Sequence, residues 1–121
     1  MGTKVRAIPE GMHTVTPVLK IKGCAAAMDF FQKAFGAEEV MRALDPSGKK
    51  VWHGCMRIGD SMLYMNDEMP EMGEAAHPSS IWLYVENVDA AFQRAVTAGA
   101  TVTMPLADMF WGDRMGKVTD P

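Results

Sequence analysis

The hydrophobic pattern from Ser80 to Ala100 predicts a strand that runs directly into a helix. Between Ser80 and Glu86, aliphatic side chains alternate with Ser, Trp and Tyr, a period of two that is typical of a strand with one face on a core. Asn87 then has a residue type that caps helices, and apolar residues follow at helical spacing up to Gly99. The pattern predicts two more strands after this helix, Ala100 to Leu106 and Arg114 to Thr119.

The same unit occurs earlier in the chain. A strand is expected from Thr14 to Lys22, with Pro17 favouring a sheet edge or a bulge because it lacks a backbone donor. A helix is expected from Cys24 to Phe35, ended by Gly36. Turn sequences at 45–48 and 59–60 then separate three further predicted strands, Glu38 to Leu44, Lys50 to Ile58 and Ser61 to Asn66.

This repetition predicts an α+β fold made of two β-α-β-β-β modules. The first module covers about 13–66 and the second covers 80–121, where the final strand of the unit is absent. The acid-rich stretch between them, 67–79, contains two prolines and no regular period, so we expect a solvated linker.

Composition narrows the function classes. The chain has 121 residues, is 48% apolar and carries a net charge of −3, so it is long enough for one domain and lacks the basic patch that nucleic acids and anionic membranes require. No apolar run approaches the roughly 18 residues of a membrane span, and no signal core is visible, which favours the cytoplasm. We expect Cys24 and Cys55 to be buried thiols in a reducing compartment.

Five short segments carry a resemblance to a known family: HTVTP at 13–17, AMDFFQKAFGAE at 27–38, RIGDSM at 57–62, YVENVDA at 84–90 and FWGDR at 110–114. With the repeated module, they resemble the vicinal oxygen chelate superfamily of glyoxalases, bleomycin-resistance proteins and extradiol dioxygenases. The resemblance implies one domain in which the two sheets form an open, curved mixed sheet around a cavity, with the helices outside.

Enzymes of that family hold a divalent metal with His, Gln or Glu side chains on the cavity face. The corresponding positions here fall on Thr16 and Ser80, which are not normal ligands for Zn, Mn, Fe or Ni. We therefore expect no metal there, so that a divalent metal is possible only elsewhere. His53 and Cys55 point the same way on one strand, and His53 is either a ligand-lining histidine or one ligand of such a metal site.

Strand parity predicts which residues line the cavity. Thr16 and Val18 from the first strand, and Trp82 and Tyr84 from the strand at 80–86, alternate with positions expected under the helices. Trp82 and Tyr84 could equally pack on the other module or a second subunit. Trp111 and Arg114 could supply a lid and a contact for an anion or a planar group. The full predicted ligand site is Thr16, Val18, His53, Trp82, Tyr84, Trp111 and Arg114.

These features predict a small-molecule binding protein that holds an apolar or aromatic ligand in a metal-free cavity. The alternatives are a metal-dependent lyase, isomerase or dioxygenase of the same superfamily, and a subunit whose role is protein contact. The absent strand would leave an unpaired slot between 80–86 and 114–119, which predicts a homodimer in which a partner segment, such as the arm 1–12, fills the slot. The rival explanation is that the chain is a shortened product of a longer gene.

Overall fold

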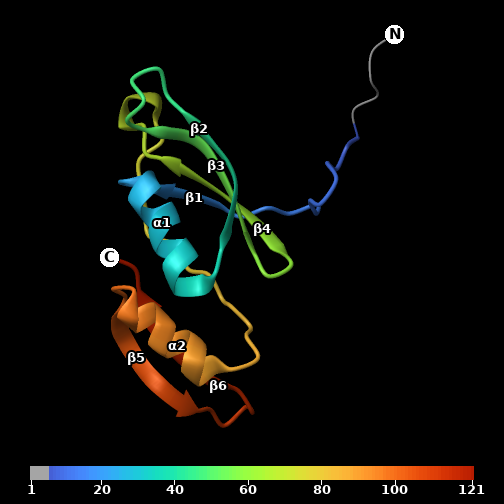
Figure 1. Ribbon diagram of the computed structural model, residues 1–121, viewed down its shortest axis with the longest axis vertical. Coiled ribbons are helices and arrows are strands. Elements are labelled where there is room, and N and C mark those ends of the chain that lie inside the picture. The colour runs from blue at the N-terminus through green and yellow to red at the C-terminus, as the bar shows by residue number, and fades with distance from the viewer. Residues whose placement is uncertain (1–5) are drawn as a thin grey trace.

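A computed structural model describes residues 6–121, which form two unequal modules joined by their helices (Figure 1). The first module contains β1 (Val18–Ile21), α1 (Cys24–Phe35), β2 (Glu38–Leu44), β3 (Val51–Ile58) and β4 (Ser61–Asp67). A short 3₁₀ helix, η1 (Pro70–Met72), follows, and the second module contains α2 (Val88–Thr97), β5 (Thr101–Asp108) and β6 (Arg114–Thr119).

The first module is a four-stranded mixed sheet in the order β1-β4-β3-β2, with β1 parallel to β4 and the other pairs antiparallel. The predicted edge position of the Pro17 strand is confirmed. The strand is shorter than the predicted Thr14 to Lys22, because Pro17 has no N–H to donate and joins the ladder only through its carbonyl oxygen, which accepts from the Tyr64 N–H at 2.9 Å.

Helix α1 covers one face of this sheet and forms the core with it. Its buried residues pack with Leu19 of β1, Met56 of β3 and Met65 of β4. The chain passes close to the helix at Gly54 of β3, where an added Cβ would lie 2.8 Å from the Met28 sulfur. The helix has the bounds predicted from the sequence, and both cysteines are buried free thiols, as expected.

The boundary of the predicted linker at Asp67 is wrong. Asp67 is the last residue of β4 and is only 6% exposed. Its Oδ1 accepts hydrogen bonds of 3.0 Å from the N–H groups of Gly23 and Cys24, and its Oδ2 accepts one of 2.7 Å from Val51. This carboxylate therefore caps the start of α1 and fixes the start of β3.

In the second module, α2 packs on the antiparallel pair β5-β6. Asn87 caps the helix as predicted, since its side-chain oxygen accepts from the Ala90 N–H at 3.1 Å. Gly116 of β6 lies under α2, where an added Cβ would be 2.6 Å from a ring carbon of Phe92. Gly116 thus has the place in the second module that Gly54 has in the first, which supports the repeat.

The predicted strand at 80–86 does not form. This segment has no ladder partner and runs as an extended loop from η1 toward α2. In the first module, β4 lies between β1 and β3 and pairs with both; among residues 6–121 no strand lies beside β6 in the corresponding place. Without that strand, the backbone at 80–86 has nothing to pair with, although its alternation is that of a strand.

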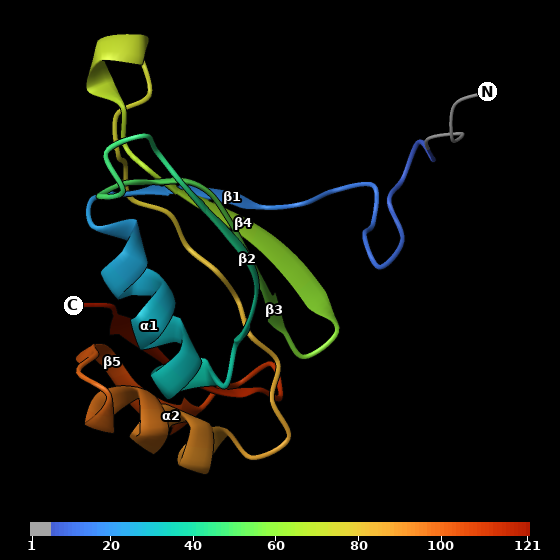
Figure 2. The ribbon, with the colours of Figure 1, turned by 45° about the horizontal axis from the view of Figure 1, so that its top comes forward.

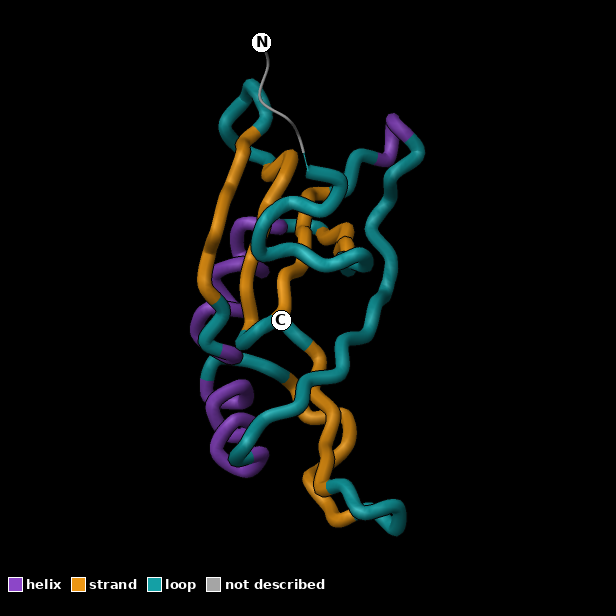
Figure 3. Tube along the Cα trace, turned by 90° about the vertical axis from the view of Figure 1, so that its right-hand side faces the viewer, coloured by secondary structure: helices purple, strands orange, loops and turns teal. Residues whose placement is uncertain are grey.

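Figure 2 shows α1 against one side of the four-stranded sheet, and Figure 3 shows α2 beside the β5-β6 pair. In Figure 3 the segment after η1 runs down the right-hand side of the view before it crosses toward α2. The first five residues of the arm 1–12 lie outside the described residues. In residues 6–121, no helix is long and apolar enough to cross a membrane.

Candidate functional site

The candidate site is the face of the four-stranded sheet that points away from α1. Register places Val18 of β1 opposite Tyr64 of β4, and Tyr64 opposite Cys55 of β3. Residues directly opposite one another share a face, so these three side chains lie together, while Leu19 and Met65 lie on the α1 face. Val18 is 49% exposed, which makes it an apolar residue on an open surface.

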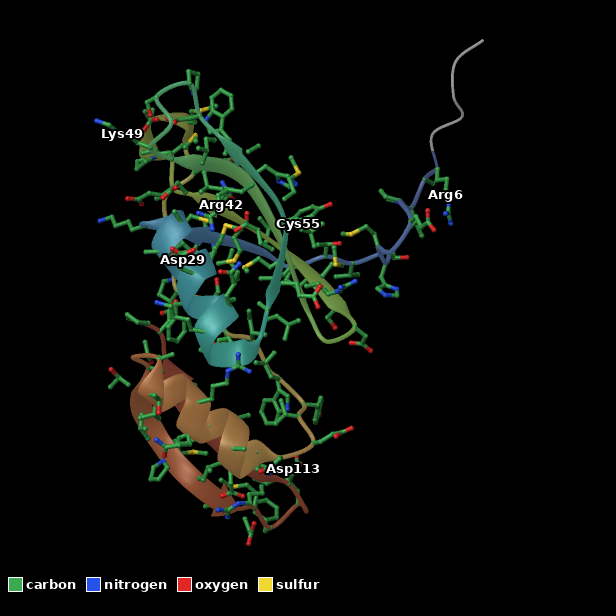
Figure 4. All side chains as sticks on the ribbon, viewed as in Figure 1. Arg6, Asp29, Arg42, Lys49, Cys55 and Asp113 are labelled. Carbon is green, nitrogen blue, oxygen red and sulfur yellow. The ribbon has the colours of Figure 1, made fainter. Side chains whose placement is uncertain are left out.

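His53 joins this face, because it lies two residues before Cys55 on β3. Its ring and that of Tyr64 meet edge to face with centroids 4.5 Å apart. Figure 4 shows Cys55 on the sheet near these strands. Burial raises the pKa of the Cys55 thiol, so it remains protonated and apolar at neutral pH.

The opposite face of the sheet is occupied by the helix. Arg42 of β2, which lies beside Gly54, donates from Nη2 to Asp29 of α1 at 3.2 Å and to Glu39 at 2.7 Å (Figure 4). These bonds tie β2 to the helix. In the described residues, no helix packs on the side of the sheet that carries Val18 and Tyr64.

A hollow of about 240 Å³ lies where the chain enters β1. It is lined by His13, Val15, Thr16, Pro17, Ser61 and Met62. The predicted site residue Thr16 therefore borders a concave surface, at one end of the face that carries Val18 and Tyr64.

A second hollow, of about 330 Å³, lies at the other end of β4, between the sheet and the loop around η1. Its lining residues are Trp52, Asn66, Met69, Met72 and Glu74. We call it the η1 hollow. The loop approaches the sheet partly through Lys20 of β1, whose Nζ lies 3.0 Å from a carboxylate oxygen of Glu74. The stretch predicted to be a solvated linker thus forms one wall of the η1 hollow.

Trp82 and Tyr84 lie on the extended segment and are exposed by 54% and 85%. Their ring centroids are 6.2 Å apart and their planes are tilted by 50°, so the two rings lie near each other. The aromatic neighbour of His53 in the described residues is Tyr64 rather than either of these rings. Their place in a ligand site stays a prediction.

Trp111 and Arg114 have partners within the second module. The indole N–H of Trp111 donates to Asp113 at 2.8 Å, and the Arg114 guanidinium binds Asp89 at 2.8 Å and Asp108 at 3.3 Å. The hydrogen bond from Arg114 lowers the pKa of Asp89. Arg114 is therefore already paired with two carboxylates, and an anionic ligand would have to compete with them.

The donor set at the family's metal positions does not fit a transition metal. Thr16 offers a hydroxyl beside the first hollow, and Ser80 offers one on an exposed loop. Neutral hydroxyls are poor ligands for such ions compared with imidazole, carboxylate or thiolate groups. The metal-free cavity nevertheless stays a prediction.

Sequence reasoning missed Tyr64 and the residues of the η1 hollow. Tyr64 could have been found, because the alternation of β4 places it on the face opposite Leu63 and Met65. Met69 and Met72 could not, since no periodic pattern reveals that an acidic loop folds back over a sheet.

Comparison with known proteins agrees with this fold. A family model described as the Glyoxalase/Bleomycin resistance protein/Dioxygenase superfamily matches residues 13–121. An uncharacterized protein of Mycobacterium bovis is 43% identical over 116 residues, which cover 88% of this chain and 76% of that protein.

Two solved structures have a similar fold. A superfamily member from Sphaerobacter thermophilus has a TM-score of 0.68 at 23% identity, over 90% of this chain and 89% of that one. A protein of Pseudomonas aeruginosa has a TM-score of 0.66 at 26% identity, over 88% of both chains. The fold and the family expected from the motifs are confirmed, and the chain belongs to the Glyoxalase/Bleomycin resistance protein/Dioxygenase superfamily.

Proposed function

We propose that this protein binds an apolar or aromatic small molecule on the sheet face opposite α1, without a metal at the Thr16 and Ser80 positions. The observation that carries the proposal is the set of side chains on that face. Val18 lies opposite Tyr64 and Tyr64 lies opposite Cys55, and the ring of His53 meets that of Tyr64 edge to face.

The chemistry of this face suits a planar apolar ligand. Ligand sites are mostly apolar, with a few polar groups that fix orientation. His53 and the Tyr64 hydroxyl supply such groups, and the protonated Cys55 thiol beneath them adds no charge. The hollow lined by Thr16, where the chain enters β1, extends this surface.

We further propose that the site is completed in a homodimer. Among residues 6–121, β6 is hydrogen-bonded to β5 alone, and the segment 80–86 is unpaired. A strand of a second copy placed between them would convert 80–86 into a strand and turn Trp82 and Tyr84 onto a common face. A dilution series followed by light scattering tests this: the dimer predicts a mass that falls with dilution toward the monomer, and a monomer at every micromolar concentration contradicts it.

A thermal-shift screen separates binding from metal-dependent catalysis. Protein treated with a chelator and dialysed is screened against planar aromatic compounds and, separately, against Zn, Mn, Fe and Ni salts. The proposal predicts that aromatic compounds raise Tm with or without chelator. If protein incubated with one of these salts retains one metal equivalent after dialysis, and both Thr16→Ala and Ser80→Ala lose that metal, a metalloenzyme is supported instead.

A further inference from the structure

We propose that the η1 hollow binds a soft monovalent cation, Cu(I) or its analogue Ag(I), through the thioethers of Met69 and Met72 with the indole of Trp52 against the ion. This site uses none of the residues assigned to the ligand in the proposed function, and neither Thr16 nor Ser80 lines it. It uses residues that the loop and the sheet bring to one concave surface.

The spacing of the two methionines brings their side chains together. Met69 is the residue before η1, and Met72 is its last residue. Met69 has φ of −135° and ψ of 77°, and the hydrogen bond of 2.9 Å from the Met72 N–H to the Met69 carbonyl oxygen closes the turn between them. Both methionines line the same hollow.

The turn is fixed by its own backbone. Met72 and Glu74 both donate to the Met69 carbonyl oxygen, at 2.9 and 3.0 Å, and Met69 in turn donates to the Glu74 carbonyl at 2.6 Å. Pro70 at the start of η1 and Gly73, with φ of 77°, suit this geometry. The turn is therefore organised before an ion arrives, which lowers the entropic cost of binding.

The turn is also anchored to the sheet. The Glu68 N–H donates to the Ile21 carbonyl oxygen at 3.0 Å, and the Glu68 side chain accepts from the Ala76 N–H at 2.9 Å. Lys50 donates to the Glu68 carbonyl oxygen at 3.2 Å. These bonds hold the methionines at a set place beside Trp52.

The donor atoms select the ion. Thioethers are soft, neutral ligands that favour Cu(I) over Zn, Mg or Ca, and an indole face attracts a cation. The nearby carboxylate of Glu74 is engaged by Lys20, which makes it a poor ligand for a hard divalent ion. Met72 is 71% exposed, so its thioether is accessible to an incoming ion.

The test is a titration of the full chain with silver nitrate, followed by NMR of methionine labelled with carbon-13 at the ε-methyl. Signals are assigned with Met69→Leu and Met72→Leu, which keep the volume of the side chain and remove the sulfur. Met41→Leu is the matched control, because Met41 is exposed on β2 outside the hollow.

The proposal predicts that the Met69 and Met72 signals shift together and saturate near one equivalent of silver. Each Leu variant weakens binding at least about tenfold, so that the shift at the other methionine no longer saturates near one equivalent, while Met41→Leu changes neither. Unmoved Met69 and Met72 signals, as when silver goes to Cys24 or Cys55, overturn it. A shift of Met41 as large as those of Met69 and Met72 also overturns it.

Discussion

The Nε of Arg94 in α2 donates a hydrogen bond of 2.7 Å to the carbonyl oxygen of Lys33 in the last turn of α1. Its Nη2 lies 3.4 Å from the carbonyl oxygen of Gln32. The last carbonyl groups of a helix have no partner within it and carry partial negative charge, so the guanidinium satisfies them. One side chain of the second module thus caps the helix of the first.

Replacing Arg94 by Ala should weaken the contact between the modules. The loss of a charged donor to carbonyl groups on an exposed surface predicts a decrease of about 1 kcal/mol in the free energy of unfolding, measured by urea denaturation. Gln93→Ala, on the same helix, is the control and should change it by less than about 0.5 kcal/mol. Equal effects of the two variants would show that Arg94 does not cap α1.

Gly54→Ala should destabilise the first module. The added Cβ would lie 2.8 Å from the Met28 sulfur and 3.0 Å from the Met65 carbonyl oxygen, and the backbone oxygen cannot move aside easily. Overpacking of this kind lowers the free energy of unfolding by about 1–3 kcal/mol. Thermal unfolding measures this loss, and we expect a similar loss in Gly116→Ala. Ser61→Ala, in the exposed hairpin, is the control. A Gly54→Ala protein as stable as the parent would show that α1 is farther from β3.

Asp67→Asn should destabilise the protein although the shape of the side chain is kept. An amide presents one oxygen and one NH₂ to three backbone N–H donors, so at least one buried donor loses its acceptor. We expect the free energy of unfolding, measured by urea denaturation, to fall by about 2 kcal/mol. Asp60→Asn, in the exposed hairpin turn, is the control and should be nearly neutral; the reverse order of the two would refute the role of Asp67.

The ion pair of Arg114 with Asp89 predicts a specific acid dependence. Arg114 lowers the pKa of Asp89 in the folded protein. The stability that this ion pair contributes is therefore present above the pKa of Asp in the unfolded chain, about 3.9. It is lost as the pH falls through the lower pKa of Asp89 in the folded protein. Carboxyl NMR should show the titration midpoint of Asp89 below the unfolded value, returning toward it in Arg114→Gln. Arg57→Gln, at a surface pair of the first module, is the control and should leave Asp89 unchanged.

The sequence predicted the first module closely because each of its elements finds its partners within it. Three local features predict the same sheet: the alternation of β4, the Gly-Asp hairpin and the apolar face of α1. The strand at 80–86 was predicted wrongly for the opposite reason. Its residues alternate like a strand, but a strand also requires a neighbour, and a local pattern does not report whether one exists.

The site was predicted in part for a similar reason. Parity placed Val18 on the face away from α1, as the register of β1 with β4 has it, since a period of two is a local property. Thr16 lies before β1, and its place in a ligand site stays a prediction. The η1 hollow depends on Glu68 bonding back to β1 and to the loop at Ala76. Such contacts between an irregular loop and a sheet have no signature in hydrophobic periodicity.

The central claim, that a ligand binds on the sheet face opposite α1, is tested most directly by calorimetric titration of Val18→Asp with the aromatic compound that gives the largest thermal shift. Val102→Asp is the matched control, since Val102 is an exposed strand valine of the second module, 41% exposed against 49% for Val18. A charge placed against an apolar ligand predicts at least a tenfold rise in Kd, about 1.4 kcal/mol, for Val18→Asp and no change for Val102→Asp. Unchanged Kd in Val18→Asp, or an equal rise in both variants, would contradict the account.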